Sequence, residues 1–150
     1  MLITPSVSSA SVIACRLTVA SSPTISNNTN TQITFDTTVR SDGGLTIGGG
    51  HAVTISAGAG AGWYDIHIQT SFPGSSAGTT RQISAWVNGA YLCAYSVGFG
   101  AADVYLSGDS GAVYLNIGDT VDMYIFQDSG GSMTLINTAM GRPTLSMVKH

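Results

Sequence analysis

Glutamate is absent from this 150-residue chain, and lysine occurs once, at Lys149. Charged residues make up only 9% of the sequence, against roughly 25% in an ordinary soluble domain. Glutamate and lysine are residues that solvate helix faces, so their scarcity argues against exposed helices. A surface with so few charges is also poorly protected against association. We therefore expect other subunits to cover much of it.

Positive charge and cysteine are scarce as well. The net charge is −3, and the four arginines are scattered and form no basic cluster. The chain therefore lacks the positive surface that nucleic-acid binding requires. The two cysteines, Cys15 and Cys93, form neither a disulfide framework nor a metal-ligand spacing. We expect both to be buried thiols that act as small hydrophobic residues.

Long apolar runs are missing too. No stretch approaches the ~20 residues that a membrane-spanning helix needs, so we expect no membrane insertion. The first residues lack the positive charge and the unbroken apolar stretch of a signal peptide, which argues against secretion. The length is typical of one domain. We expect that domain to span residues 15–150, with residues 1–14 acting as an N-terminal strap or anchoring segment.

Glycine and β-branched residues are abundant, and they indicate strands joined by tight turns. Apolar and polar residues alternate over residues 32–40 and 51–56, as in half-buried strands. Asn88-Gly89, the preferred type I′ turn, lies between two alternating runs and predicts a hairpin over residues 81–95. Nine or ten strands and no convincing helix predict an antiparallel sandwich or barrel. The remaining strands are expected at residues 14–19, 63–70, 103–107, 112–117, 121–127, 133–140 and 143–148.

Several strands have a second face that carries aromatic residues instead of charges. In the predicted hairpin, Trp86 opposes Tyr91 as a cross-strand aromatic pair, and Ala85 opposes Leu92. A monomer rarely exposes a large contiguous apolar patch. We therefore interpret these second faces as a subunit interface formed by Trp86, Tyr91, Tyr95, Tyr124 and Phe126.

Five short stretches follow one another in a recognisable order: ITFDT at 33–37, GWYDIHI at 62–68, VNG at 87–89, LNIGDTV at 115–121 and PTLSM at 143–147. Together they resemble the C1q/TNF-like jelly roll, in the version found in bacteriophage virion proteins, over residues 15–150. The resemblance implies a compact homotrimer with one sheet facing the three-fold axis, and Tyr124 and Phe126 near that axis. Fibre-borne members hang from a collagen-like or coiled-coil shaft, which nothing in this sequence matches.

Three patterns suggest chemistry, and another interpretation is favoured for each. Asp65 and His67 share one strand face, as half of a catalytic or metal site would, but no nucleophile motif accompanies them. Residues 107–111 read SGDSG, like a serine-protease motif, yet they are predicted to form a turn between strands. Residues 56–62 read SAGAGAG, but a strand pattern follows them, whereas a phosphate-binding loop needs a helix.

Carboxylate chemistry is weakly indicated. Asp119 and Asp122 are close in sequence, but they belong to a turn and to the strand after it, so they do not make a glycosidase pair. No D-x-D-x-D-G loop exists, which leaves calcium as a minor alternative. We expect no enzyme activity, no cofactor and no resident metal.

The resemblance implies a non-catalytic structural protein of a tailed-phage virion, assembled in the host cytoplasm. It would be a trimeric knob on the particle surface, either a capsid decoration protein or a minor tail or tail-fibre tip protein, in contact with other virion proteins. Binding of a host-surface glycan stays open, with residues 41–50, 71–79 and 98–102 as the outward loops. The alternatives are a secreted C1q-like or lectin-like recognition module and a polysaccharide depolymerase.

Overall fold

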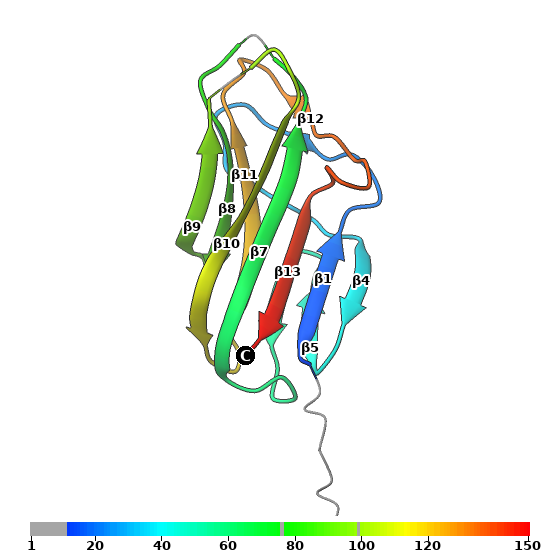
Figure 1. Ribbon diagram of the computed structural model, residues 1–150, viewed down its shortest axis with the longest axis vertical. Helices are drawn as coiled ribbons and strands as arrows, with labels where there is room; N and C mark the ends of the chain where they lie inside the picture. Colours follow the sequence, from blue (N-terminus) through cyan, green and yellow to red (C-terminus); the bar gives the residue numbers. More distant parts are fainter. Residues whose placement is uncertain (1–11, 76, 99) are drawn as a thin grey trace, which may run out of the picture.

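The computed structural model describes residues 12–75, 77–98 and 100–150, and within them all regular structure is β-strand (Figure 1). Two sheets pack face to face, and every strand pairing is antiparallel. The predicted all-β antiparallel sandwich is confirmed. The strands are β1 Ala14–Thr18, β2 Thr24–Ile25, β3 Thr31–Gln32, β4 Thr37–Ser41, β5 Leu45–Gly48, β6 Ala52–Ile55, β7 Gly62–Phe72, β8 Arg81–Val87, β9 Ala90–Val97, β10 Val104–Leu115, β11 Thr120–Gln127, β12 Met133–Thr134 and β13 Thr144–Lys149.

The first sheet has the strand order β10-β7-β13-β1-β4, and the second sheet has the order β5-β6-β11-β8-β9. β3 adds to β11 of the second sheet, and β2 pairs with β12 as a separate two-stranded ribbon. β1 begins at Ala14, within one residue of the expected start of the domain. Residues 1–11 of the expected N-terminal strap lie outside the described residues.

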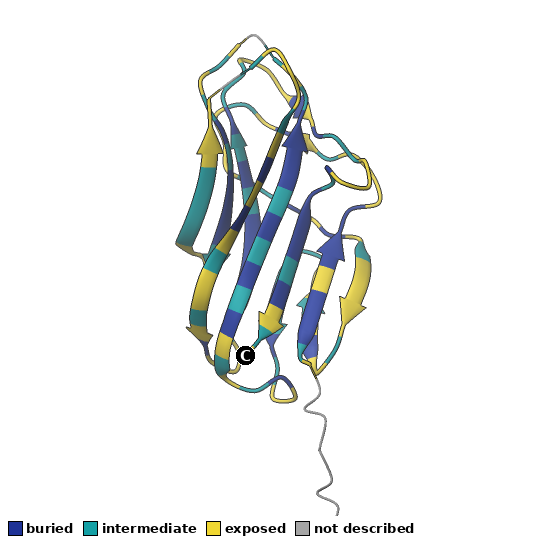
Figure 2. Ribbon diagram, viewed as in Figure 1, coloured by how far each residue is buried: buried dark blue, intermediate teal, exposed yellow. Residues whose placement is uncertain are grey.

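The core lies between the two sheets and is built from alternate residues of each strand. Along β7, buried and half-buried residues alternate, which is visible as a banded strand in Figure 2. Each fully buried aliphatic or aromatic side chain contributes roughly 1.5–3 kcal/mol relative to exposure. The second sheet contributes the inner face of β11, namely Val121, Met123 and Ile125, which alternate with the outward Tyr124 and Phe126.

The run predicted as one strand over residues 32–40 is two strands in different sheets. β3 pairs with β11 in the second sheet, whereas β4 pairs with β1 in the first. Ile33 and Phe35, which lie in the segment between these strands, are buried, but Val39, which continues the same alternation, is 57% exposed. The alternation fails after Phe35 because the chain crosses from one sheet to the other.

The turn predicted at residues 107–111 is a bulge inside one strand. β10 passes through it and pairs with β7 on both sides, and the register shifts between Asp109 and Ala112. Gly111 lies in the bulge with a φ of 67°, a conformation that glycine adopts readily.

Two other expectations also need correction. The strand predicted over 133–140 is only β12, and the loop predicted over 41–50 contains β5, an edge strand.

The hairpin predicted at Asn88-Gly89 is confirmed. Both residues have positive φ, 53° and 74°, as a type I′ turn requires. Trp86 opposes Tyr91, as expected. The Asn88 side chain also joins the hairpin to β11, because its Oδ1 accepts a hydrogen bond from the Thr120 amide at 2.9 Å.

Beyond this first pair, the predicted register of the hairpin is wrong. The pairing shifts between Ala85 and Trp86, so Ala85 opposes Cys93 and not Leu92. A one-residue shift moves all later side chains of β9 to the opposite face of the sheet. Tyr95 therefore opposes Ile83, a core residue, and packs against the core between the sheets.

Candidate functional site

An aromatic cluster lies on the outer face of the second sheet, where the sequence placed a subunit interface. The Trp86 ring lies 5.9 Å from the Tyr91 ring in an edge-to-face arrangement and 4.8 Å from the tilted Tyr124 ring. Phe126 follows two residues after Tyr124 on the same face of β11. Tyr91 is exposed, whereas the other three side chains are half-buried. The fold therefore brings together four of the five predicted residues, and Tyr95 is not among them.

A carboxylate lies beside this cluster. Asp122 is opposite Trp86 on the neighbouring strand, and its Oδ1 accepts a hydrogen bond from Gln32 Nε2 at 2.8 Å. The side chain is buried, and this burial raises the pKa of the Asp122 carboxyl above its ordinary value, against the opposing effects of Gln32 and His51. Asp119 is different, because hydrogen bonds from Asn88 and from the Asn116 amide lower its pKa. Asp119 and Asp122 thus have different hydrogen-bond partners, and their pKa values are shifted in opposite directions.

The larger set of uncovered aromatic rings lies on the other sheet. Trp63 of β7 and Tyr114 of β10 are 54% and 51% exposed, and their rings make an edge-to-face contact at 5.5 Å. Tyr105, farther along β10, is 53% exposed. Strand pairing places all three on the outer face of the first sheet. Sequence reasoning missed this set because it treated β10 as two short strands.

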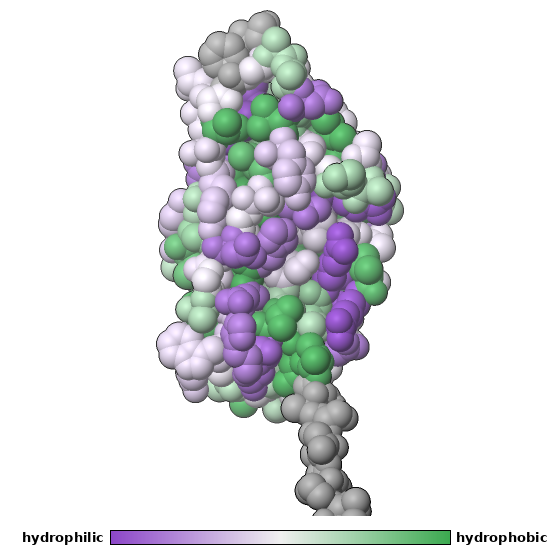
Figure 3. Space-filling view, viewed as in Figure 1, coloured by the Kyte–Doolittle hydropathy of each residue, from purple (hydrophilic) through white to green (hydrophobic). Residues whose placement is uncertain are grey.

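Polar side chains lie between these rings on the same face. His67 Nδ1 lies 2.9 Å from Asp109 Oδ1, and its Nε2 lies 3.4 Å from Gln69 Oε1. The Tyr105 hydroxyl donates to the same Gln69 oxygen at 3.1 Å. Figure 3 views this side of the molecule, where purple side chains alternate with pale and green surface. These hydrogen bonds hold the polar side chains in place between the aromatic rings. This face of the sheet therefore presents both polar and apolar groups.

Asp65 and His67 share one face of a strand, as the sequence predicts, but they do not pair with each other. Both point outward from β7, but Asp65 lies 2.8 Å from His150 Nε2, and His67 pairs with Asp109 from the next strand. Ser110, in the protease-like motif, donates its hydroxyl to the Gly111 carbonyl and accepts from the Ile66 amide. Its hydroxyl is thus engaged with backbone groups, and no serine hydrogen bond to His67 is present among the described residues.

The glycine-rich segment 56–62 is a turn that presents carbonyl groups. Lys149 Nζ donates to the Ala59 carbonyl at 2.7 Å, and the Tyr64 hydroxyl donates to the Gly60 carbonyl at 2.7 Å. A phosphate site would instead need several amide donors directed at the ligand. This turn therefore binds a lysine of its own chain.

The described residues also bear on metals, thiols and membranes. They contain no group of three or more His, Cys or acidic side chains arranged to hold a metal ion. Cys15 is buried, and burial raises the pKa of its thiol to about 11, whereas Cys93 is half-buried. No helix of the described part is long and apolar enough to cross a membrane.

One loop at the end of the sandwich is fixed by a carboxylate. Asp128 accepts hydrogen bonds from the Thr79 hydroxyl at 2.6 Å and from the Thr79 and Thr80 amides at 2.7 and 2.8 Å. The Thr79 hydroxyl bond is the largest cause of a lowered pKa of about 2 for this carboxyl. Arg81, which is buried beside it, donates to the Ala77 and Thr80 carbonyls.

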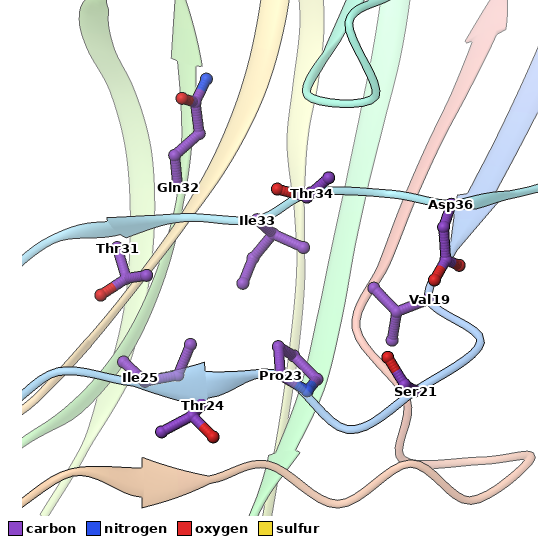
Figure 4. Close-up of a pocket in the computed structure, with 10 residues that line it drawn as sticks. All are labelled: Val19, Ser21, Pro23, Thr24, Ile25, Thr31, Gln32, Ile33, Thr34 and Asp36. Atoms are coloured by element: carbon purple, nitrogen blue, oxygen red, sulfur yellow. The ribbon is translucent and has the colours of Figure 1, made fainter.

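A groove of about 440 Å³ opens between two extended segments, residues 19–25 and 31–36 (Figure 4). Buried apolar side chains lie beneath it, and polar side chains form its rim. The sequence did not predict this groove, because it placed the binding features in other loops. Val19, Ile25 and Ile33 lie beneath the groove and are at most 2% exposed, whereas its accessible rim includes Ser21, Thr31 and Asp36.

The sequence matches no protein-family model, and no curated protein sequence matches it. Solved structures do match. The crystal structure of murine APRIL at pH 5.0 superposes with a TM-score of 0.71 at 17% identity, over 94% of this chain and 100% of that one. Eiger TNF from S. frugiperda gives 0.67 at 14% identity, over 94% of each chain. The chain therefore has the C1q/TNF-like jelly-roll fold, and the likeness at these identities concerns the fold alone.

Proposed function

We propose that this chain is a non-catalytic jelly-roll module that acts as a homotrimer, with neighbouring copies covering the outer face of the first sheet. The observation that supports this most directly is the set of half-exposed rings there, Trp63, Tyr105 and Tyr114. Full burial of an aromatic side chain is worth roughly 1.5–3 kcal/mol relative to exposure. Three such rings on one sheet face, repeated in each copy, provide a substantial driving force for association.

The outer face of the second sheet is the competing interface. It carries Tyr91, which is 55% exposed, but the rings of Trp86 and Tyr124 pack against each other, and both of them and Phe126 are half-buried. Less ring surface is therefore left for a neighbour to cover. Tyr95 contributes nothing to this face, because it is directed into the sandwich. The balance of exposed aromatic surface favours the first sheet.

The polar groups of the first sheet are compatible with burial by another copy. His67, Asp109, Gln69 and Tyr105 make hydrogen bonds to one another within the subunit, so covering them leaves fewer unpaired groups. Buried polar groups are tolerated when they keep such partners. The chain also has few charges to desolvate, since only 9% of its residues are charged.

Within this proposal, the module is a structural component of a tailed-phage virion, a knob on the capsid or tail that contacts other virion proteins. The ordered motifs from residue 33 to residue 147 and the charge-poor surface support that setting. The second candidate is a secreted recognition module, and the fold likeness to murine APRIL and Eiger TNF supports it.

Two measurements test these statements. Light scattering after size exclusion should give a mass three times the 15.4 kDa of the chain. A mass of one chain at every concentration would refute the homotrimer. In the producing culture, a virion component should sediment with particles at a fixed copy number, whereas a secreted module should stay in the cleared medium.

A further inference from the structure

The outer face of the second sheet carries a carboxylate that has no cationic partner. Asp122, on the central strand β11, is 7% exposed, and none of the ion pairs among the described residues includes it. Its hydrogen bond comes from a neutral group, the side-chain amide of Gln32. Its second oxygen, Oδ2, accepts no hydrogen bond from the described residues, yet it is not sealed from solvent. This oxygen is therefore an acceptor that a ligand can reach.

The cations of the chain itself lie away from this face. The five Lys and Arg residues are Arg16 in β1, Arg40 in β4, Arg81, which is buried beside Asp128, Arg142 just before β13, and Lys149 in β13. His51 is the titratable group whose charge acts on Asp122, and its Nδ1 is engaged with the Thr34 hydroxyl at 3.1 Å. A positive group that complements the carboxylate must therefore come from a partner.

The folded chain keeps this carboxylate at a cost in stability. Burial raises the pKa of Asp122, so folding disfavours its ionised form, which predominates at neutral pH. An asparagine would still accept the hydrogen bond from Gln32 without that penalty. Ionisable groups that lower stability in this way are typical of functional sites.

Aromatic rings lie beside the carboxylate. The strand order places Trp86 between Asp122 on β11 and Tyr91 on β9. Ser84 accepts a hydrogen bond from the Trp86 indole at 2.9 Å, so the indole N–H is already used and the ring is held in place. Tyr91 is 55% exposed, and Trp86 and Tyr124 are half-buried. The accessible parts of these rings attract a cation through their π-electron faces.

This combination of groups discriminates among cations. A guanidinium is planar and weakly hydrated, so it can stack on an aromatic ring while its N–H groups donate to a carboxylate. A lysine ammonium is compact and strongly hydrated, and it cannot stack in this way. A quaternary ammonium has no N–H group to donate to Asp122. The guanidinium is therefore the cation that uses both the rings and the free carboxylate oxygen.

We propose that the outer face of the second sheet docks an arginine side chain of a protein partner. The guanidinium lies on Trp86, between Tyr91 and Asp122, and donates to Asp122 Oδ2. A sheet face holds a ligand from one side only, whereas sites for free small molecules are enclosed. Arginine and aromatic residues are enriched at protein interfaces, which fits delivery by another protein surface. The proposal rests on the proposed function only in that the trimer leaves the second sheet uncovered.

The test is a titration of the intact, nitrogen-15-labelled chain with N-acetylarginine amide at pH 7 and constant chloride concentration. The indole N–H signal of Trp86 and the amide signal of Tyr91 should shift in a saturable way, and the indole signal of Trp63, on the other sheet, should not. N-acetylcitrulline amide, which has a similar shape without the charge, should produce no saturable shift. Equal responses to the two probes, or no response to the arginine probe at tens of millimolar, would overturn the proposal. Tighter binding of N-acetyllysine amide would overturn it in favour of an ammonium site.

Two aspartates provide a matched pair of variants. Asp122→Asn removes the charge but keeps an acceptor for Gln32, and it should weaken binding of the arginine probe at least about tenfold, as expected for a lost hydrogen bond between charged groups. Asp42→Asn removes the same charge at an exposed position after β4 and should leave the affinity unchanged. Equal affinities of the two variants would place the arginine elsewhere and refute the site.

Light scattering on the same samples separates this proposal from the proposed function. A chain that keeps the mass of a trimer but does not bind the arginine probe would refute the docking site alone. A monomeric chain that binds the probe at Trp86 would support the docking site and refute only the homotrimer.

Discussion

Tyr95 lies where the side chain of residue 108 would otherwise be. A Cβ atom added to Gly108 would be only 2.0 Å from Cε2 of the Tyr95 ring, and the Tyr95 hydroxyl donates to the Asp109 carbonyl. Tyr95 belongs to β9 of the second sheet and Gly108 to β10 of the first. The ring therefore joins the two sheets at the edge of the sandwich, and glycine at position 108 provides the space for it.

The first prediction follows from this contact. Gly108→Ala should destabilise the chain by about 1–3 kcal/mol, as overpacking of a well-filled site does, because the ring must move to admit the methyl group. Urea unfolding monitored by tryptophan fluorescence measures the change. Gly131→Ala is the control, since no atom lies within 4 Å of the added Cβ there. Equal stability of Gly108→Ala and the wild type would mean that the ring has room to move.

The second prediction separates the two candidate interfaces. Tyr114 and Tyr91 are 51% and 55% exposed, so replacing either by aspartate disturbs the folded subunit to a similar, small degree. Tyr114→Asp should convert the trimer into monomers, because it places a charge on the outer face of the first sheet. Tyr91→Asp should remain trimeric in light scattering. The reverse outcome would assign the interface to the second sheet, as the sequence alone suggested.

Much of the fold follows from the sequence, and the failures share a physical cause. Period-two alternation and the Asn88-Gly89 turn identify most strands and the inner face of β11. Alternation of apolar and polar residues, however, shows which face of the sheet a side chain occupies only while the strand register is unbroken. The bulges in β9 and β10 and the sheet crossing after residue 35 each break it, and local composition does not mark them. Tyr95 was misplaced for this reason.

The candidate site was less predictable because its contacts join distant parts of the chain. His67 pairs with Asp109, 42 residues away, and the neighbouring Asp65 pairs with His150. Such partners depend on the order of strands in the sheet and not on spacing in the sequence. The groove likewise depends on distant partners, because the segments beside it are held by β12 and by β11.

The third prediction concerns acid stability. Hydrogen bonds from Thr79 and Thr80 hold the pKa of Asp128 at about 2, below its ordinary value. A carboxyl whose pKa is lowered by folding stabilises the folded state above about pH 4, and this contribution is lost as the pH falls towards 2. Asp128→Asn should therefore lower the melting temperature at pH 7. The difference from wild type should shrink as the pH is lowered from 4 to 2, which differential scanning calorimetry measures.

The fourth prediction has the opposite sign. Burial raises the pKa of Asp122, so the folded state favours the protonated carboxyl, and ionisation above about pH 4 costs stability. Asp122→Asn removes that cost, while its amide oxygen can still accept the hydrogen bond from Gln32. The variant should melt higher than the wild type at pH 7 by a few degrees, since 1 kcal/mol corresponds to about 2–4 °C in a chain of this size. The gain should vanish below about pH 4.

Calorimetry on both variants across one pH series provides the internal control, because Asp128→Asn and Asp122→Asn must change stability in opposite directions at pH 7. A loss of stability in Asp122→Asn at neutral pH would show that Gln32 and His51 outweigh the burial of the carboxylate.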